Sequence, residues 1–212
     1  MLYKMFRTFT FLIAFLAFQS LFVFAQTNKK VEIKRIDAYC KTVDAFTKRY
    51  KNPQLIYADT SDYNRNSKPK WRKFASEKAL EKFRGKSETY TIAYNWQKNG
   101  KIVKSNFTLF SPSGDWANYV YHNFRADGTL AKAESETRTF NGDLIIIQNF
   151  YFNRQGKLLK RSVKYLDLQT QKPIKPTKEF LETRGDFSND IEYFKKTGKL
   201  PFANLLRRKT KD

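Results

Sequence analysis

The sequence holds little of what enzymes and metal sites are built from: one cysteine, Cys40, and one histidine, His122, among 212 residues. A single cysteine excludes a disulfide within the chain, so packing must hold the fold together. One thiol and one imidazole also exclude a zinc site made of nitrogen and sulfur ligands from one chain. No Gly-x-Gly and no Gly-x-Ser-x-Gly occurs, which removes a phosphate-binding glycine loop and a nucleophile elbow. We therefore predict no metal and no cofactor.

Charge within the first 25 residues is limited to Lys4 and Arg7, which precede an apolar run from Phe9 to Ala25. Small residues at positions 23 and 25 suit a signal peptidase. We predict a signal peptide over 1–25, cleaved between Ala25 and Gln26, and a protein that is periplasmic or secreted. The alternative is an uncleaved membrane anchor, because the run is nearly long enough to span a bilayer.

Acidic residues are also few: 20 against 41 basic ones, a formal net charge of +21. Without Lys4 and Arg7 the charge is 21 − 2 = +19. Such an excess favours polyanionic partners, and export argues against nucleic acid among them. An anionic membrane surface or glycan remains, although lysine that merely keeps a secreted protein soluble explains the charge equally well. The basic loop around Trp71 is the predicted contact: Lys68, Lys70, Trp71, Arg72 and Lys73.

The mature chain of 187 residues (212 − 25) suits a single domain, 26–212. Apolar residues at steps of three and four predict an amphipathic helix over 31–50. QLIYAD, at 54–59, suits a short strand, and a basic loop is expected over 56–75. A short helix is expected over 76–84, capped by Ser76 and ended by Gly85. After a central region over 87–168, two prolines open a C-terminal extension, 173–212. Two short helices are expected there, one ending at Gly198 and one starting at Pro201.

Glycines recur every 14 residues in the central region, at positions 100, 114, 128, 142 and 156. A longer phrase recurs every 28: NWQKNGKIVK at 95–104, NFRADGTLAK at 123–132 and YFNRQGKLLK at 151–160. Asn-Gly and Asp-Gly favour two-residue hairpin turns, and the segments between are rich in aromatic and β-branched residues. We predict an antiparallel meander of six strands, near 87–98, 101–112, 115–126, 129–140, 143–154 and 157–168. The fold class is α+β.

Pairing these strands through two-residue turns gathers the apolar residues on one face. Trp96 would then lie opposite Val103, and Phe124 opposite Ala131, while Lys104 and most other charged residues fall on the outer face. An exposed apolar face needs a cover, so we expect the helix to seat on it, in a half-barrel or nearly closed barrel. Polar and aromatic residues within this face form the predicted ligand site: Trp96, Trp116, Asn118, His122, Gln148, Phe150 and Arg161.

His122 would lie beside Ser105 in this arrangement, but no carboxylate is placed to orient it. We interpret it as a core histidine, and we identify no catalytic set. The first hypothesis is a non-catalytic exported protein that holds an apolar or amphiphilic small molecule on the apolar face. The alternative is a structural or interaction module of the cell envelope that binds anionic lipid or glycan. An outer-membrane barrel is disfavoured, because six strands are too few. Oligomeric state is left open.

Overall fold

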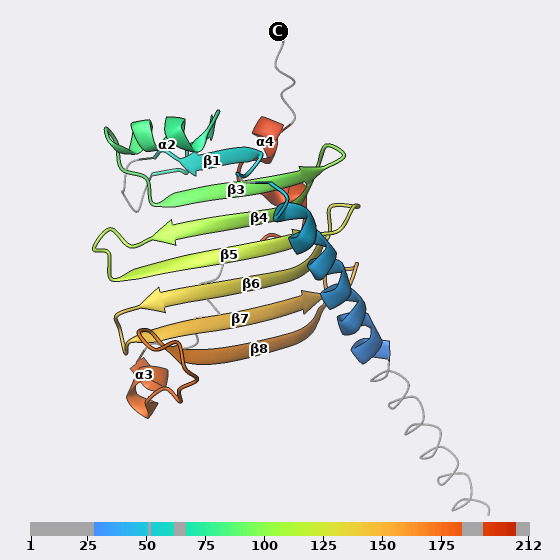
Figure 1. The fold of residues 1–212 in the computed structure, drawn as a ribbon, viewed down its shortest axis with the longest axis vertical. Coiled ribbons are helices and arrows are strands. Elements are labelled where there is room, and N and C mark those ends of the chain that lie inside the picture. The colour runs from blue at the N-terminus through green and yellow to red at the C-terminus, as the bar shows by residue number, and fades with distance from the viewer. Residues whose placement is uncertain (1–27, 51, 62–66, 184–192, 207–212) are drawn as a thin grey trace, which may run out of the picture.

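A computed structural model describes residues 28–50, 52–61, 67–183 and 193–206, so the predicted signal peptide lies outside the described part of the chain. The fold is α+β, with one antiparallel sheet in the order β2-β1-β3-β4-β5-β6-β7-β8 (Figure 1). The strands are β1 (Leu55–Asp59), β2 (Trp71–Phe74), β3 (Thr91–Lys98), β4 (Lys101–Phe110), β5 (Trp116–Phe124), β6 (Leu130–Thr139), β7 (Leu144–Phe152) and β8 (Leu158–Asp167).

The six-stranded meander is confirmed as β3–β8, and two further strands extend it. Strand β1 pairs with β3 and lies where QLIYAD suited a short strand. Strand β2 pairs with β1 and lies where the sequence predicted only a basic loop. The sheet is open, with β2 and β8 as its edges, so a nearly closed barrel is wrong.

The recurring phrase encodes a bulge as well as a turn. Its ninth residue, which is Val103, Ala131 or Leu159, is skipped where β3–β4, β5–β6 and β7–β8 pair. In the second and third copies the turn is a three-residue loop ending in a glycine with positive φ. The extra loop residue and the bulge offset each other. The expected pairing therefore holds along the rest of these strands.

The first copy differs, and one prediction fails there. Its turn is the tight two-residue kind, with positive φ at Asn99 and Gly100, yet the bulge at Val103 remains. Nothing offsets the bulge, so Trp96 pairs with Lys104 instead of Val103. A shift of one residue turns every side chain of a strand to the opposite face. Trp96 therefore faces away from the side of the sheet that carries Trp116, and the shared face predicted for them is wrong.

The predicted N-terminal helix is confirmed over residues 28–47, but it lies on the face opposite to the one expected. A row of paired residues that we had placed on the outer face runs beneath it, including Lys104, Lys132 and Tyr151. The Lys104 ammonium lies 2.5 Å from the Asp44 carboxylate, and the Tyr151 hydroxyl donates to Asp37 at 2.9 Å.

The bulges explain why the helix lies there. Ala131 and Leu159 turn toward it and pack in one cluster with Ile36 and Cys40. Successive bulges are two strands apart, about 9.5 Å. Seven helical residues rise about 10.5 Å, so an apolar stripe at steps of three and four can meet one bulge after another. Figure 1 shows the helix crossing the strand ends where these turns lie.

The apolar face is covered instead by the C-terminal segment, residues 193–206. Phe202 is fully buried and stacks on Tyr57 with ring centroids 4.2 Å apart. The segment opens with YFKKTGKL at 193–200, a fourth version of the phrase that reads YFNRQGKL at 151–158. It forms no hairpin. Lys196 bridges to Thr129, and the Thr197 N–H donates to the Gly128 carbonyl at 2.9 Å.

Short helices complete the fold. Helix α2 (Glu77–Arg84) is confirmed, with Ser76 as its N-cap and Leu80 buried against β1 and β2. Helix α3 (Lys178–Thr183) seats Phe180 on β7. The helix predicted to end at Gly198 is wrong for residues 193–196, which are not helical and precede a 3-10 turn, η2 (Thr197–Lys199). Helix α4 (Ala203–Leu206) follows Pro201 as expected. No helix in the described ranges is both long and apolar enough to cross a bilayer.

Candidate anion site

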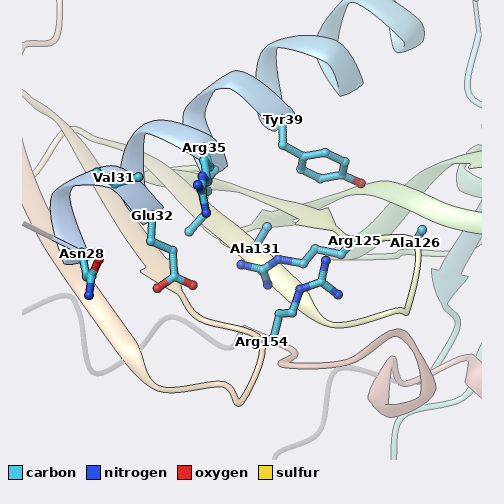
Figure 2. Close-up of a pocket in the computed structure, with 10 residues that line it drawn as sticks. Asn28, Val31, Glu32, Arg35, Tyr39, Arg125, Ala126, Ala131 and Arg154 are labelled. Carbon is cyan, nitrogen blue, oxygen red and sulfur yellow. The ribbon is translucent and has the colours of Figure 1, made fainter.

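A cleft of about 610 Å³ lies between the first half of the N-terminal helix and the turns that follow β5 and β7 (Figure 2). Guanidinium groups approach it from three segments: Arg35 from the helix, Arg125 after β5 and Arg154 after β7. The other lining residues are Asn28, Val31, Glu32, Ile36, Tyr39, Ala126 and Ala131. Arginine presents a planar fork of donors that matches carboxylate, phosphate and sulfate groups, so the cleft has the chemistry of an anion site.

Arg125 is the fixed member of this group. Its Nη1 donates to the Leu130 carbonyl and its Nη2 to the Phe152 carbonyl, each at 2.6 Å. Burial and the nearby Arg154 lower the pKa of Arg125, while Asp127 and Glu32 act in the opposite direction. An arginine remains charged in a protein even so. Arg125 therefore braces two turns and supplies an immobile positive charge.

Arg154 is held less firmly. Its Nη1 lies 2.7 Å from Oδ2 of Asp127, and its side chain is mostly exposed. The other oxygen of Asp127 accepts from the Thr129 N–H at 2.9 Å and from the Thr129 hydroxyl at 2.6 Å, and these bonds lower the pKa of Asp127. An exposed ion pair of this kind is worth little in water, so Arg154 can exchange Asp127 for another anion at small cost.

Glu32 competes for the same charges. Figure 2 shows Arg125 and Arg154 close together, with the Glu32 carboxylate reaching toward them from the helix. Glu32 also acts to raise the pKa of Arg125, as a nearby negative charge does. The cleft thus contains a counter-charge that an incoming anion would replace.

Further cations lie at the same end of the sheet as the cleft. Turns of the first and third copies contribute lysines, and the fourth copy brings three more beside them, with Lys196 bridged to Thr129. Together with the three arginines these residues define the basic end of the sheet: Arg35, Lys98, Lys101, Arg125, Arg154, Lys157, Lys195, Lys196 and Lys199. The repeated phrase carries this charge, because each copy delivers cations to the same end of the meander.

Five of the seven residues predicted to bind a small molecule lie near one another on the apolar face: Asn118, His122, Gln148, Phe150 and Arg161. Trp116 shares this face at the opposite end of its strand, and Trp96 is on the other side of the sheet. The C-terminal segment packs over part of the set, with Tyr193 against Phe150. The structure thus brings most of this predicted site together and places a segment of the chain on it.

His122 is fully buried among aromatic rings. Its Nε2 accepts from the Phe194 N–H at 3.2 Å, and its ring lies parallel to that of Phe124 at 5.7 Å. Burial lowers the pKa of His122 to about 3, and the Val120 carbonyl opposes this shift only in part. The imidazole is therefore neutral at ordinary pH and serves as an acceptor that anchors the C-terminal segment. This is the core role that the sequence indicated.

The predicted polyanion contact lies on and just before β2, at the edge of the sheet. Lys70, Trp71 and Arg72 line a cleft of about 660 Å³ beside the end of α2, while Lys68 and Lys73 are exposed. Trp71 packs inward on Phe107, and the guanidinium of Arg72 lies 5.2 Å from the Phe74 ring centre. Trp71 is thus mainly a core residue, while Arg72 and the lysines remain exposed cations here.

Comparison with known proteins adds no function: no family model, curated protein or solved structure matches the chain. The arginine cleft itself was missed in the sequence, because its residues meet only once the helix is placed on the correct face. Arg125 and Arg154 occupy neighbouring positions in successive copies of the phrase, and that was the available signal.

Proposed function

We propose that the protein is a non-catalytic, exported module of the cell envelope that binds a polyanion at its basic end. The observation that carries the proposal is the convergence of Arg35, Arg125 and Arg154 on one cleft. The surrounding lysines add attraction at longer range, which raises the rate of encounter with a negatively charged partner. The partner would be an anionic glycan or the headgroups of anionic lipids.

Binding would use the three arginines differently. Arg125, held by two carbonyls, provides a fixed charge, while Arg154 and Arg35 turn toward the bound group and donate paired hydrogen bonds. Asp127 and Glu32 compete with the ligand for the same donors. This competition favours a multivalent ligand, because a polymer can contact the cleft and the outer lysines together.

A second candidate function is the binding of an apolar or amphiphilic molecule on the apolar face. Its support is that Oε1 of Gln148 is buried without a hydrogen-bond partner among the described residues. Buried polar atoms normally have partners. Such a ligand would have to share the face with residues 193–206 or displace them, and for this reason the polyanion proposal ranks first.

Binding of dextran sulfate, with uncharged dextran as the control polymer, tests the polyanion proposal. We expect the double variant Arg35→Ala/Arg154→Ala to bind dextran sulfate at least about tenfold more weakly, since each lost charge-assisted pair is worth about 1.5 kcal/mol or more. Glu32→Gln should tighten binding. Arg84→Ala, in α2 and outside the basic end, is the matched control. If Arg84→Ala lost as much affinity for dextran sulfate as the double variant, the cleft would be rejected as the binding site.

A further inference from the structure

Exposed apolar side chains gather at the end of the sheet opposite the basic end. Trp116 is 39% exposed, Phe140 68%, Ile174 44% and Leu181 45%. We call these four residues the apolar end. A single exposed apolar residue is ordinary on a protein surface, but a group of them marks a surface that meets another apolar phase.

These side chains belong to neighbouring segments. The Phe140 N–H donates to the Asp115 carbonyl at 3.0 Å, which joins the turn after β6 to the residue before Trp116. A Cβ on Gly142 would lie 3.1 Å from the Phe180 ring, so α3 packs against that same turn. Phe110 and Leu168 line a cleft of about 300 Å³ together with Trp116 and Phe140. The apolar surface around Trp116 and Phe140 thus spans two turns, with α3, which carries Leu181, packed beside it. Ile174 lies next to the end of β8, where its N–H donates to the Tyr165 carbonyl at 3.0 Å.

Charges of both signs flank the apolar end: Asp115 lines the cleft, and Glu179 and Glu182 are exposed on α3. Lys172 and Lys175 lie on either side of Ile174, and both are exposed. Arg138 lines the cleft and also pairs with Glu136. Apolar side chains beside exposed charges of both signs match a phospholipid surface, where rings and aliphatic groups enter the interface and charged groups stay among the phosphates and ammonium groups of the lipids. Tryptophan and phenylalanine suit that boundary, because they place large apolar area at the level of the headgroups.

We propose that the apolar end inserts into the headgroup region of a phospholipid bilayer. The proposal concerns the end of the sheet away from the arginine cleft and stands independently of the polyanion site. A protein with both properties would bridge a membrane and a polyanionic polymer. A strand rises about 3.3 Å per residue, so strands of about ten residues place the two surfaces roughly 30 Å apart.

Tryptophan fluorescence tests the insertion, since Trp116 is an exposed member of the apolar end. The purified protein is mixed with vesicles of phosphatidylcholine and phosphatidylglycerol, and brominated phosphatidylcholine serves as the quencher. We expect emission to shift to shorter wavelength and to be quenched, and Trp116→Phe to remove most of the quenching. Phe140→Asp should weaken partitioning about tenfold, because burial of an aromatic side chain is worth at least about 1.5 kcal/mol.

Leu158→Asp is the matched control. Leu158 is 45% exposed, like the members of the apolar end, but it follows the turn at the basic end. The Leu158→Asp variant should bind vesicles as the unaltered protein does. Binding without quenching of Trp116 would mean that the basic end alone holds the vesicle, and would overturn the proposal. The proposal would also be overturned if the protein did not bind vesicles, or if Leu158→Asp weakened vesicle binding as much as Phe140→Asp. A dimer that Phe140→Asp abolishes would overturn it as well, because the apolar end would then be a dimer interface.

Discussion

Substitution of Gly128 measures how firmly the C-terminal segment is seated on the sheet. Gly128 and Gly100 hold the same place in two copies of the phrase, with φ of 80° and 71°. Alanine at either position must adopt the left-handed conformation, which costs about 1–2 kcal/mol. A Cβ at Gly100 meets nothing within 4 Å, whereas one at Gly128 lies 2.7 Å from the Thr197 hydroxyl oxygen. Gly128→Ala therefore carries the backbone cost and a steric conflict with the segment.

Chemical denaturation of the two variants separates these costs. We expect Gly100→Ala to lower the free energy of unfolding by about 1 kcal/mol, and Gly128→Ala by about 1–2 kcal/mol more, the usual range for overpacking. Thr197→Ala added to Gly128→Ala should restore most of the difference, and a double-mutant cycle measures that coupling. Equal destabilisation by the two glycine substitutions, with no rescue, would refute the contact between the segment and the turn.

Three further predictions concern the core and the helix. Because the pKa of His122 is about 3 when folded and about 6.5 when unfolded, the unfolded chain alone takes up this proton as pH falls below 6.5. The free energy of unfolding of the unaltered protein, relative to that of His122→Gln, should therefore fall by on the order of 4 kcal/mol between pH 6.5 and 3. If urea titrations show that this difference does not change with pH, burial of the neutral ring is contradicted. Tyr151→Phe should lower the free energy of unfolding, measured by thermal denaturation, by about 1 kcal/mol. In a protein that already carries Asp37→Ala it should have no further effect, because the hydrogen bond between the two side chains is then already lost. Burial raises the pKa of Cys40 to about 12, so a thiol reagent at pH 8 should label it only as fast as the protein opens; prompt labelling of the native protein would show that the helix is not packed on the bulges.

Much of the meander could be predicted from the sequence, because turns have strong local signals. The glycines at steps of 14 marked each reversal, and the expected pairing holds along β4 to β8 beyond the bulges. The amphipathic stripe likewise located the N-terminal helix. QLIYAD pointed to β1, but β2 was harder to recognise, since it is short and carries basic residues within a stretch rich in turn formers.

The faces of the sheet were harder to assign, because one skipped residue decides them. The same place in the phrase is occupied by Val103, Ala131 and Leu159. After the longer turns, the bulge at Ala131 or Leu159 restores the expected register, whereas after the shorter turn the bulge at Val103 shifts the register by one residue. Composition could not reveal this difference. The helix was assigned to the wrong face for the same reason: Ala131 and Leu159 were counted on the apolar face, whereas the bulge turns them toward the helix.

The arginine cleft follows from that placement. Arg35 meets Arg125 and Arg154 only when the helix lies over the bulged ends of the strands. The C-terminal segment, which repeats the phrase without forming a hairpin, completes the basic end from the other face of the sheet. Both arrangements depend on contacts distant in sequence, which local patterns do not encode.

Side-chain NMR of the arginines tests the polyanion site most directly, because each Nε–H group reports on its own surroundings. Titration with dextran sulfate should shift the signals of Arg35 and Arg154 most, with a smaller change at the already bonded Arg125 and almost none at Arg84 in α2. Shifts spread evenly over all arginines, or largest at Arg72 beside β2, would contradict a specific anion site between the helix and the turns.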